Sequence, residues 1–547
     1  MNHNGTHLFL KGRPALVLWL FTLCLWLPWL GNLPLRDWDE ALIASISHST
    51  MGQDGLERLL PIRWDGNYLN KPPGLHWLIG AMSQCFGRAE WALRLVPALL
   101  STLAVPLIVL LRQELAVTCG KGSDGRRNDE RSAWLAGLIL MTLLPMARQG
   151  RLVMLDGVQL SCALLLWWGW LRSLREPWIG LLAGLGSSGV LLSKPPALLG
   201  FLVIPIVIGL AENQLVPNSE RSNRARIHWS TRFSWVLLGL VPGISWHAWN
   251  FNQRGDQAWH MWGAQGLARV TTVLGDKSGA WVMPLTEVLE GGWPWLLLLP
   301  SGLIWAWRCR HRRVGCWELG LLIGCSAMVL PLKTQLPWYS HLLWPPIALL
   351  CAESLNELLE NQRHRWIAGC WAGLGAILIL AASLLQFKVI AIAVPPSPAL
   401  LAGAGLLVGG ISLQSTSKNR RRQGLTVLLC GWSLGLLFLW QSGSWLWELN
   451  ETWDPRPIAA RIRTLPASAL VLREGNEHPA LDWYSERKIA RISESSHPAG
   501  EFWLISNQFQ ERCQMFDAAK PFDSEIWGLW FCPALDTDSI VAPSPTP

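Results

Sequence analysis

Charged residues are scarce in this chain, and tyrosine is scarcer still. Asp, Glu, Lys and Arg make up 15% of its 547 residues, whereas a soluble domain carries about 25%. Three tyrosines stand against 37 tryptophans. So little charge excludes a chain that is mainly soluble or disordered. Many of the tryptophans fall near the ends of apolar blocks, as rings at a membrane interface do.

Motifs for common nucleotide and metal chemistry are also missing. The sequence contains no Walker loop and no HExxH motif, and its twelve cysteines form no CxxC pair. This argues against an ATP-driven enzyme and against a zinc site. The net charge of +8 does not indicate a nucleic-acid partner, because the basic residues gather in short loops between apolar blocks.

The apolar residues form long blocks, which is typical of repeated membrane spans. We predict thirteen spans at 14–34, 91–111, 133–147, 157–171, 177–193, 197–213, 233–251, 292–307, 316–332, 338–354, 366–386, 397–413 and 424–441. The expected fold is therefore mainly α, a polytopic membrane protein with about 13 transmembrane helices. A shorter apolar segment, 73–87, contains His76 and Gln84 and is predicted to lie at the outer interface.

The basic loops predict the orientation in the membrane. With the N-terminus in the cytoplasm, every short inner loop is basic, as the positive-inside bias requires. These inner loops are 112–131, 172–175, 221–232, 308–313, 363–365 and 418–422. If 73–87 were a further span, all later loops would be inverted. We therefore expect a multi-pass protein of the plasma (inner) membrane with an extracytoplasmic C-terminus.

The tail differs in composition from the rest. Residues 1–445 are expected to form the membrane part, with a catalytic outer loop at 35–90. In residues 446–547, short apolar runs alternate with polar and helical stretches, which predicts a small extracytoplasmic α/β domain. Cys513 and Cys532 both lie in it. An outer location permits a disulfide between them, although both are equally compatible with free thiols.

Three acids follow the first span within four positions: Asp37, Asp39 and Glu40. Carboxylates this close to a bilayer are costly to bury, so they are expected in water or in a protein-lined cavity. One interpretation is an ordinary solvated loop. Our hypothesis is a catalytic floor just outside the membrane, with Asp39 as the base.

A Lys-Pro-Pro tripeptide occurs twice, at Lys71 and at Lys194, each time just before an apolar helix. Proline is tolerated in the first turn of a helix, so each lysine stands beside free backbone N–H groups and the positive end of the helix dipole. That combination favours an anion, above all a phosphate. The alternative is a lysine that reaches the lipid headgroups. Two such turns on one face favour the phosphate.

Two further span ends carry polar residues on the outer face. Arg151 and Asp156 flank an outer turn; either Asp156 caps the next helix and pairs with Arg151, or it orients Lys194 or a sugar hydroxyl. Near the entrance of a later span, the hydroxyl of Tyr339, with Lys333 or His341, would be able to bind a phosphate oxygen. The alternative for Tyr339 is a ring in the interfacial aromatic belt.

Taken in chain order, these motifs resemble a known family. The segments DWDEALIA and NKPPGLHWLIG, the span-end R-x4-D and the second Lys-led turn are similar to those of the GT-C glycosyltransferases of the protein O-mannosyltransferase and lipid A aminoarabinose transferase type. The resemblance runs from about residue 30 to residue 350. The Asp-Glu and Lys-Pro-Pro elements together are fairly specific, whereas each alone is weak.

The resemblance implies a sugar donor linked to a polyprenyl phosphate, and a lipid or protein acceptor. Asp39 matches the family's catalytic acid, and Glu40 completes the Asp-Glu pair. The positions implied to bind the donor phosphate and sugar are Lys71, Asp156, Lys194, Tyr339, Arg151 and His341. Asn70 and Gly266 stand where members often have metal-ligating Glu and His residues. We therefore expect no cofactor, with a divalent metal as the alternative.

These observations predict a single-step, inverting glycosyl transfer at the outer membrane face, in which Asp39 takes a proton from the acceptor hydroxyl. The alternative is a transporter or flippase of a lipid-linked substrate, which would also need cations and a cavity. Transporters tend to show internal repeats and broken helices at the midplane, and the polar residues here gather on one face. A structural scaffold would explain neither Lys-Pro-Pro turn.

Overall fold

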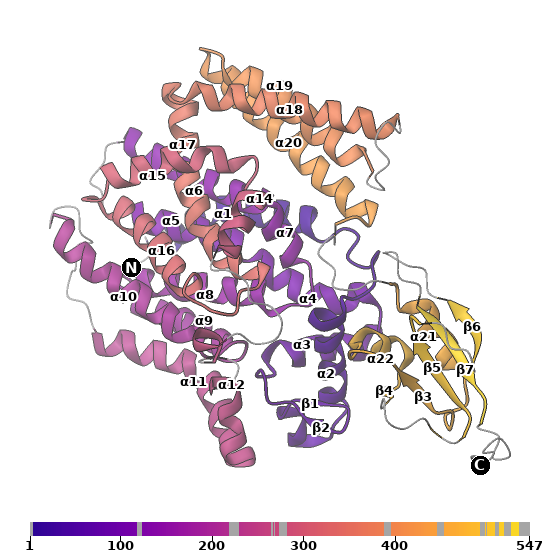
Figure 1. The fold of residues 1–547 in the computed structure, drawn as a ribbon. Helices are drawn as coiled ribbons and strands as arrows, with labels where there is room; N and C mark the ends of the chain where they lie inside the picture. The colour runs from indigo at the N-terminus through magenta and orange to yellow at the C-terminus, as the bar shows by residue number, and fades with distance from the viewer. Residues whose placement is uncertain are drawn as a thin grey trace, which may run out of the picture.

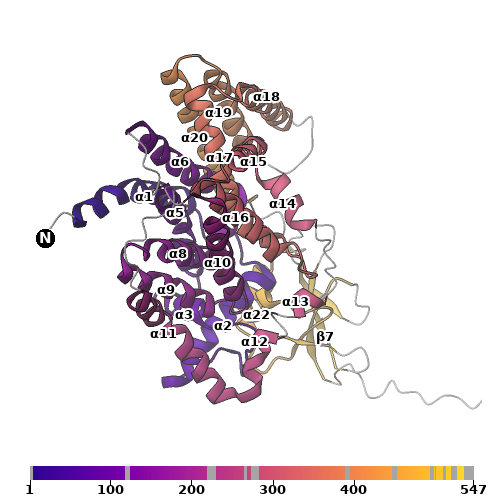
Figure 2. The same ribbon diagram turned by 90° about the vertical axis from the view of Figure 1, so that its left-hand side faces the viewer.

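The computed structural model describes residues 4–116, 123–217, 229–263, 266, 268–272, 282–387, 395–445, 453–492, 498, 500–508, 513–518 and 527–534. The protein is mainly helical, with a small β-sheet unit near the C-terminus (Figure 1). Figure 2 shows the same molecule from the side, where the α18–α20 hairpins again lie at one end. Gln265 lies outside the described residues.

The helices follow one another along the chain, with η marking the short 3-10 or π segments. The first half contains α1 (Asn4–Trp26), η1 (Asp37–Ala41), α2 (Leu42–Met51), η2 (Gly55–Leu59), α3 (Gly74–Phe86), α4 (Glu90–Thr102), α5 (Ala104–Ala116), α6 (Ser123–Thr142), α7 (Leu144–Gly150), α8 (Leu155–Arg172), η3 (Pro177–Ile179), α9 (Gly180–Leu191) and α10 (Ala197–Leu215). The second half contains α11 (Trp229–Arg254), η5 (Gly255–Trp259), α12 (His260–Trp262), α13 (Ala268–Thr271), α14 (Met283–Gly291), η7 (Trp295–Leu298), α15 (Leu299–Arg308), α16 (Arg313–Val329), η8 (Pro337–Leu343), α17 (Trp344–Asn361), α18 (Arg365–Gln386), α19 (Ser397–Leu413), α20 (Lys418–Ser442), α21 (Arg456–Thr464) and α22 (Pro479–Ser485).

Each predicted span overlaps a helix, but the count of thirteen spans is not confirmed. Among the described residues, five helices are long and apolar enough to cross a membrane, or six if the bent pair α7–α8 is one span. The first block is shorter than predicted, because α1 ends at Trp26. Pro28 follows and cannot donate a helical hydrogen bond. The segment 73–87 forms α3, which is not among those five, and its place at the interface stays a prediction.

The last three long helices, α18 to α20, pack side by side at one end of the helical part (Figure 1). They join the main core through Trp371 and Trp440. Glycines allow the close approach of the three helices. A Cβ atom on Gly375 would lie 2.6 Å from the Gly403 oxygen, and one on Gly405 would lie 2.7 Å from the Gly431 Cα. Backbones that approach this closely are typical of helices that associate within a membrane.

The tail contains the expected α/β unit. Its strands are β3 (Val471–Arg473), β4 (Ala490–Arg491), β5 (Phe502–Ser506), β6 (Gln514–Ala518) and β7 (Gly528–Cys532), in the sheet order β4-β3-β5-β7-β6. The β3–β4 and β3–β5 pairs are parallel, and the others are antiparallel. Ile458 and Ile462 of α21 pack on one face of this sheet, against Ile505 and Leu529. The predicted boundary near residue 446 lies outside the described residues.

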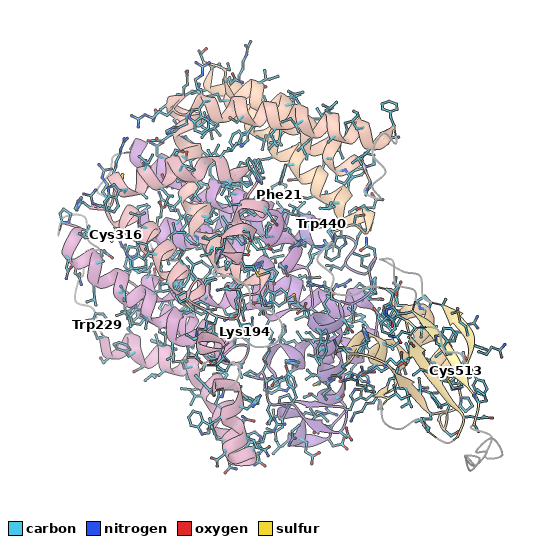
Figure 3. All side chains as sticks on the ribbon, in the orientation of Figure 1. Phe21, Lys194, Trp229, Cys316, Trp440 and Cys513 are labelled. Carbon is cyan, nitrogen blue, oxygen red and sulfur yellow. A yellow bond between two sulfur atoms is a disulfide. The ribbon has the colours of Figure 1, made fainter. Side chains whose placement is uncertain are left out.

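A disulfide joins Cys513, just before β6, to Cys532 at the end of β7. Figure 3 labels Cys513 in this sheet and Lys194 within the helical part. The sequence left this pairing open, and the structure shows it formed.

The outer loop folds into a compact hairpin of helices. After η1 and α2, a two-stranded ribbon of β1 (Ile62–Arg63) and β2 (Gly66–Asn67) leads back to α3. Helices α2 and α3 lie in close contact at Gly80, where an added Cβ atom would lie 2.6 Å from the Ser47 carbonyl oxygen. This contact fixes the acidic segment η1, which leads into α2, relative to the Lys-Pro-Pro start of α3.

Candidate active site

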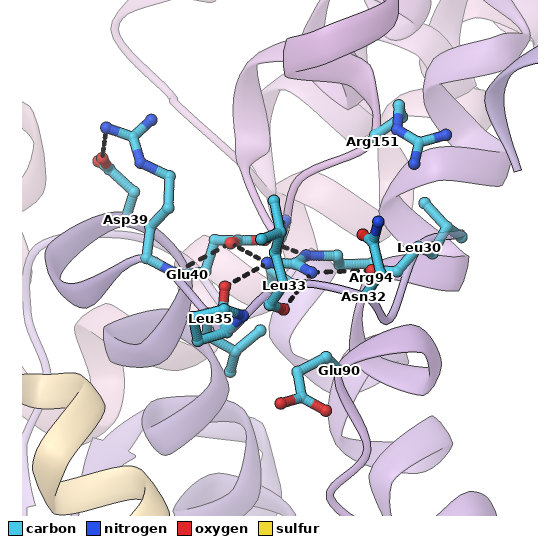
Figure 4. Close-up of polar contacts among 12 residues, drawn as sticks. Leu30, Asn32, Leu33, Leu35, Asp39, Glu40, Glu90, Arg94 and Arg151 are labelled. Carbon is cyan, nitrogen blue, oxygen red and sulfur yellow. Dashed lines mark hydrogen bonds and ion pairs between the residues drawn. The ribbon is translucent and has the colours of Figure 1, made fainter. Parts of the chain in front are cut away.

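The acidic segment is anchored by one buried ion pair, Glu40 with Arg94 (Figure 4). Both side chains are 0% exposed. The guanidinium donates to both Glu40 carboxylate oxygens, at 2.8 and 2.6 Å. It also donates to the carbonyls of Leu30, Leu33 and Pro34 at 2.8–2.9 Å. All five guanidinium donors are thereby used, and Arg94 ties the end of the first span to the acidic segment.

Glu40 also accepts hydrogen bonds from its own segment and from the turn between α7 and α8. Its carboxylate accepts the backbone N–H groups of Arg36 at 3.0 Å and Val153 at 2.8 Å. Burial alone would raise the pKa of Glu40, but the guanidinium of Arg94 and these hydrogen bonds outweigh it and lower the pKa. Glu40 was predicted to be catalytic with Asp39. Its complete burial and full set of partners support a positioning role instead.

Asp39 lies next to this anchor but takes no part in it. Its carboxylate points away from Arg94 and lies 3.4 Å from the guanidinium of Arg36 (Figure 4). The side chain is 16% exposed, unlike that of Glu40. A partly accessible carboxylate on a rigid turn is suited to accept a proton.

The third acid, Asp37, binds the C-terminal unit. Its carboxylate accepts the N–H of Ala480 at 2.6 Å and lies 3.1 Å from Nδ1 of His478. It therefore caps the first turn of α22 from a distant part of the chain. Tyr484 of the same helix accepts the N–H of Leu35 at 2.8 Å. The C-terminal unit thus holds the segment that carries Asp39.

The two Lys-Pro-Pro turns meet. The N–H of Gly74, which follows the first turn, donates to the carbonyl of Leu192 at 3.1 Å, two residues before Lys194. An added Cβ atom on Gly74 would lie 2.6 Å from that oxygen, so only glycine permits this approach. Lys71 and Lys194, 123 positions apart in the sequence, are thereby brought to neighbouring turns.

Lys194 is paired with the acid predicted to orient it. Its ammonium group lies 2.5 Å from Asp156 Oδ1 and 5.9 Å from the ring centroid of Tyr339. His341, 3% exposed, lies close enough to interact electrostatically with Asp156, Lys194 and Arg148. Neither ring nitrogen of His341 has a hydrogen-bond partner in the part of the chain that the structure describes.

One apolar cluster connects the bases of these elements. Ala41 of η1, Leu75 of α3 and Leu155 of α8 belong to it, together with Val153 and Ala480. These residues are next to or near Asp39, Lys71 and Asp156 in sequence. The candidate residues of the outer loop and of α8 therefore stand on a shared packed base.

Arg151 does not belong to this group. It is fully buried and donates to the carbonyls of Trp26 and Trp29. Its guanidinium lies over the rings of Trp440 and Trp445, 4.5 and 4.7 Å from their centroids. The predictions that it binds the donor or pairs with Asp156 are not supported by this geometry. It instead joins the end of α1 to the end of α20 through cation–π contacts.

The two expected metal-ligand positions are used in other ways. The Asn70 side-chain oxygen lies 3.0 Å from Nε2 of His260, so the residue before Lys71 is tied to the loop after α11. An added Cβ atom on Gly266 would lie 2.4 Å from Pro196. Among the described residues, no group of three or more His, Cys, Asp or Glu side chains would hold a metal ion.

Sequence reasoning missed Arg94 and His478. Arg94 had a signal, because a lone arginine within the apolar block EWALRLVPALL must be paired or reach water. His478 had none, since its contact with Asp37 spans 441 positions.

Three comparisons with known proteins agree with these features. Residues 62–251 match the family model of dolichyl-phosphate-mannose-protein mannosyltransferases. An undecaprenyl phosphate-alpha-4-amino-4-deoxy-L-arabinose arabinosyl transferase of Pseudomonas fluorescens is 26% identical over 342 residues, which is 60% of this chain and 57% of that relative. The chain thus matches little more than half the length of that relative.

The fold is similar to that of ArnT from Cupriavidus metallidurans. The structure bound to undecaprenyl phosphate superposes with a TM-score of 0.66 and 15% identity over 97% of this chain and 98% of that one. The apo structure gives a TM-score of 0.69 and 16% identity over 94% and 97%. In sequence motifs and in fold, this chain is therefore similar to the GT-C membrane glycosyltransferases of the protein O-mannosyltransferase and ArnT type.

Proposed function

We propose that this protein is a membrane glycosyltransferase that moves a sugar from a polyprenyl-phosphate donor to a hydroxyl of a lipid or protein acceptor. The observation that carries this proposal is the contact between the two Lys-Pro-Pro turns, Gly74 N–H to Leu192 oxygen at 3.1 Å. It supports a single phosphate site shared by Lys71 and Lys194. The ArnT structure with undecaprenyl phosphate shows that a protein of this fold binds such a lipid.

In this proposal Asp39 acts as the base. It takes the proton of the acceptor hydroxyl as that oxygen attacks the anomeric carbon, and the polyprenyl phosphate leaves from the opposite face. The configuration at the anomeric carbon is inverted in one step. Arg36, 3.4 Å away, orients the carboxylate, and Glu40 keeps the turn that carries it rigid.

The phosphate needs stabilisation as it leaves, because negative charge accumulates on it. Lys71, Lys194 and Tyr339 are assigned this role. Asp156 holds Lys194 in place through the 2.5 Å contact, and His341 has two ring nitrogens to offer to a bound oxygen. No general acid is required, since a phosphate is a good leaving group.

We place this site on the extracytoplasmic face, with the N-terminus in the cytoplasm. The basic inner loops support this orientation, and so does the Cys513–Cys532 disulfide, which is typical of an oxidising compartment. On this side, the C-terminal unit holds the Asp39 segment through Asp37. No specific observation favours a transporter or flippase.

The test is mass spectrometry of envelope glycolipids and proteins from cells with and without the gene. We expect one glycolipid or protein to lose a sugar mass increment in the deletion strain and to regain it on complementation. Unchanged glycolipids and proteins, or a purified protein that moves the lipid-linked sugar across vesicles without transferring it, would contradict the proposal.

A further inference from the structure

One buried amide near the proposed phosphate site has no hydrogen-bond partner among the described residues. Asn250, near the end of α11, is 0% exposed. Neither its amide nitrogen nor its amide oxygen has a hydrogen-bond partner in the described part of the chain. A buried polar group without a partner is destabilising, and native proteins rarely contain one without a reason.

The neighbouring turns of α11 show where Asn250 faces. One turn before it, Trp246 Nε1 donates to the carbonyl of Leu59 at 2.8 Å. One turn after it, Arg254 donates to the carbonyl of Tyr68 at 3.0 Å. Residues one turn apart share a helix face. Asn250 therefore faces the outer loop, between the end of η2 and the first Lys-Pro-Pro turn.

Three aromatic side chains in the same region also carry buried nitrogens without partners, within the described residues. They are Nδ1 of His247, Nε1 of Trp262 and Nε2 of His76. The rings of His247 and Trp262 lie 5.5 Å apart, and the ring of His76 lies 5.9 Å from that of Tyr68. With Asn250, four side chains thus carry buried polar atoms without a partner among the described residues.

This group lies next to the phosphate site. Nε2 of His247 is 3.2 Å from the carbonyl of Leu191, and the next carbonyl, of Leu192, accepts the N–H of Gly74. His76 lies one turn beyond Lys71 and interacts electrostatically with it. If the phosphate of a ligand lies between the two lysines, the part of the ligand attached to that phosphate reaches these four side chains.

We propose that His76, His247, Asn250 and Trp262 bind the sugar of the donor, and that this subsite selects an uncharged sugar. The inference rests on the proposed function. An amide both donates and accepts hydrogen bonds, and an indole or imidazole adds a further polar atom beside an apolar face. Sugar hydroxyls and the apolar face of a pyranose ring match this set.

The charges nearby explain the selectivity. In the described part of the chain, no hydrogen bond or ion pair joins a carboxylate to any of these four side chains, whereas Lys71 interacts with His76 and Arg254 binds the carbonyl of Tyr68. Burial, aided by Lys71, lowers the pKa of His76 to about 3, so this ring is neutral. A sugar with an ammonium group would be buried near two cations, and none of these four side chains would supply it with a counter-ion, which is unfavourable. The aminoarabinose named for the relatives would be such a sugar.

The experiment measures binding of three lipids to the full chain in nanodiscs: undecaprenyl phosphate, undecaprenyl phosphate mannose and undecaprenyl phosphate 4-amino-4-deoxy-L-arabinose. We expect the mannose donor to bind about tenfold tighter than the bare lipid, as one or two added hydrogen bonds imply. The amino sugar donor is expected to bind no tighter than the bare lipid. Tighter binding of the amino sugar than of mannose would overturn the selectivity.

Substitutions at Asn250 test the subsite itself. Asn250→Ala is expected to abolish the tenfold gain from mannose and to leave the bare lipid unaffected. Since it removes a buried amide without a partner, the ligand-free protein should keep or gain thermal stability. Asn250→Asp should favour the amino sugar by supplying a counter-ion. Asn252→Ala, on the exposed face of the same helix, is the matched control and should change nothing.

The outcomes separate this inference from the proposed function. If the bare lipid fails to bind, the phosphate site and the proposed function fail, and the subsite with them. If the bare lipid binds but Asn250→Ala retains the full gain from mannose, only the sugar subsite is wrong.

Discussion

Asp39→Asn is expected to reduce glycosyl transfer by about 10²–10⁴-fold, the usual contribution of a positioned general base. Asparagine has nearly the same shape but cannot take the acceptor proton. The Glu40–Arg94 anchor does not involve Asp39, so the variant should fold and insert as the wild type does. The measurement is product formed per unit of protein, quantified by mass spectrometry.

Two controls accompany this variant. Affinity for undecaprenyl phosphate should change less than about twofold, since Asp39 is assigned to the acceptor and not to the phosphate. Asp65→Asn, an exposed carboxylate of the same outer loop that pairs with Lys488, should keep full transfer. Wild-type transfer by Asp39→Asn would show that the base has been assigned wrongly.

Glu40→Gln is expected to destabilise the protein by about 3–5 kcal/mol, the typical cost of leaving one partner of a buried ion pair unpaired. Arg94 would keep its carbonyl partners but would be buried without a counter-ion. Purified yield and the thermal unfolding midpoint in detergent measure this effect. Transfer should fall with stability, because the turn that carries Asp39 depends on the same contacts.

The exposed pair Asp65–Lys488 again supplies the comparison. An exposed ion pair contributes little, so Asp65→Asn should leave the unfolding midpoint where it is. A Glu40→Gln protein that unfolds at the wild-type midpoint and keeps its yield would refute the anchor role.

The helical part of the fold could be predicted from the sequence because a long apolar block in a membrane has to satisfy its own backbone hydrogen bonds, which a helix does. Every predicted span overlaps a helix for this reason. Individual residues nevertheless changed where a predicted helix ends. The block 14–34 stops being helical at Trp26, ahead of Pro28 and of Trp29, which adopts a positive φ of 55°.

The residues of the proposed site differ in how local their sequence signals are. The Lys-Pro-Pro turns and Asp156 could be proposed from the sequence because each carries a local signal at a helix start. Arg151 carries a similar signal, but its partners Trp26, Trp440 and Trp445 come from opposite ends of the chain. Asn250, which we propose to bind the sugar, could not be proposed from the sequence, because a single amide in an apolar helix becomes notable only when its burial and its lack of partners among the described residues are known.

The strand order of the C-terminal unit was likewise beyond local reasoning. Strand β5 pairs with β3 and β7, and β6 lies at the edge beside β7. The sheet so formed packs against α21, and a disulfide joins the segment before β6 to β7. The contact of Asp37 with α22 depends on the same long-range arrangement.

The most direct measurement is a double-mutant cycle on undecaprenyl phosphate binding, with Lys71→Ala, Lys194→Ala and the double variant, and with exposed Lys488→Ala as the control. If one phosphate contacts both ammonium groups, each single variant weakens binding about 10- to 100-fold, and the two changes are coupled by at least about 0.5 kcal/mol. Changes that add to within about 0.3 kcal/mol, or a lysine whose removal has no effect, would contradict a shared phosphate site.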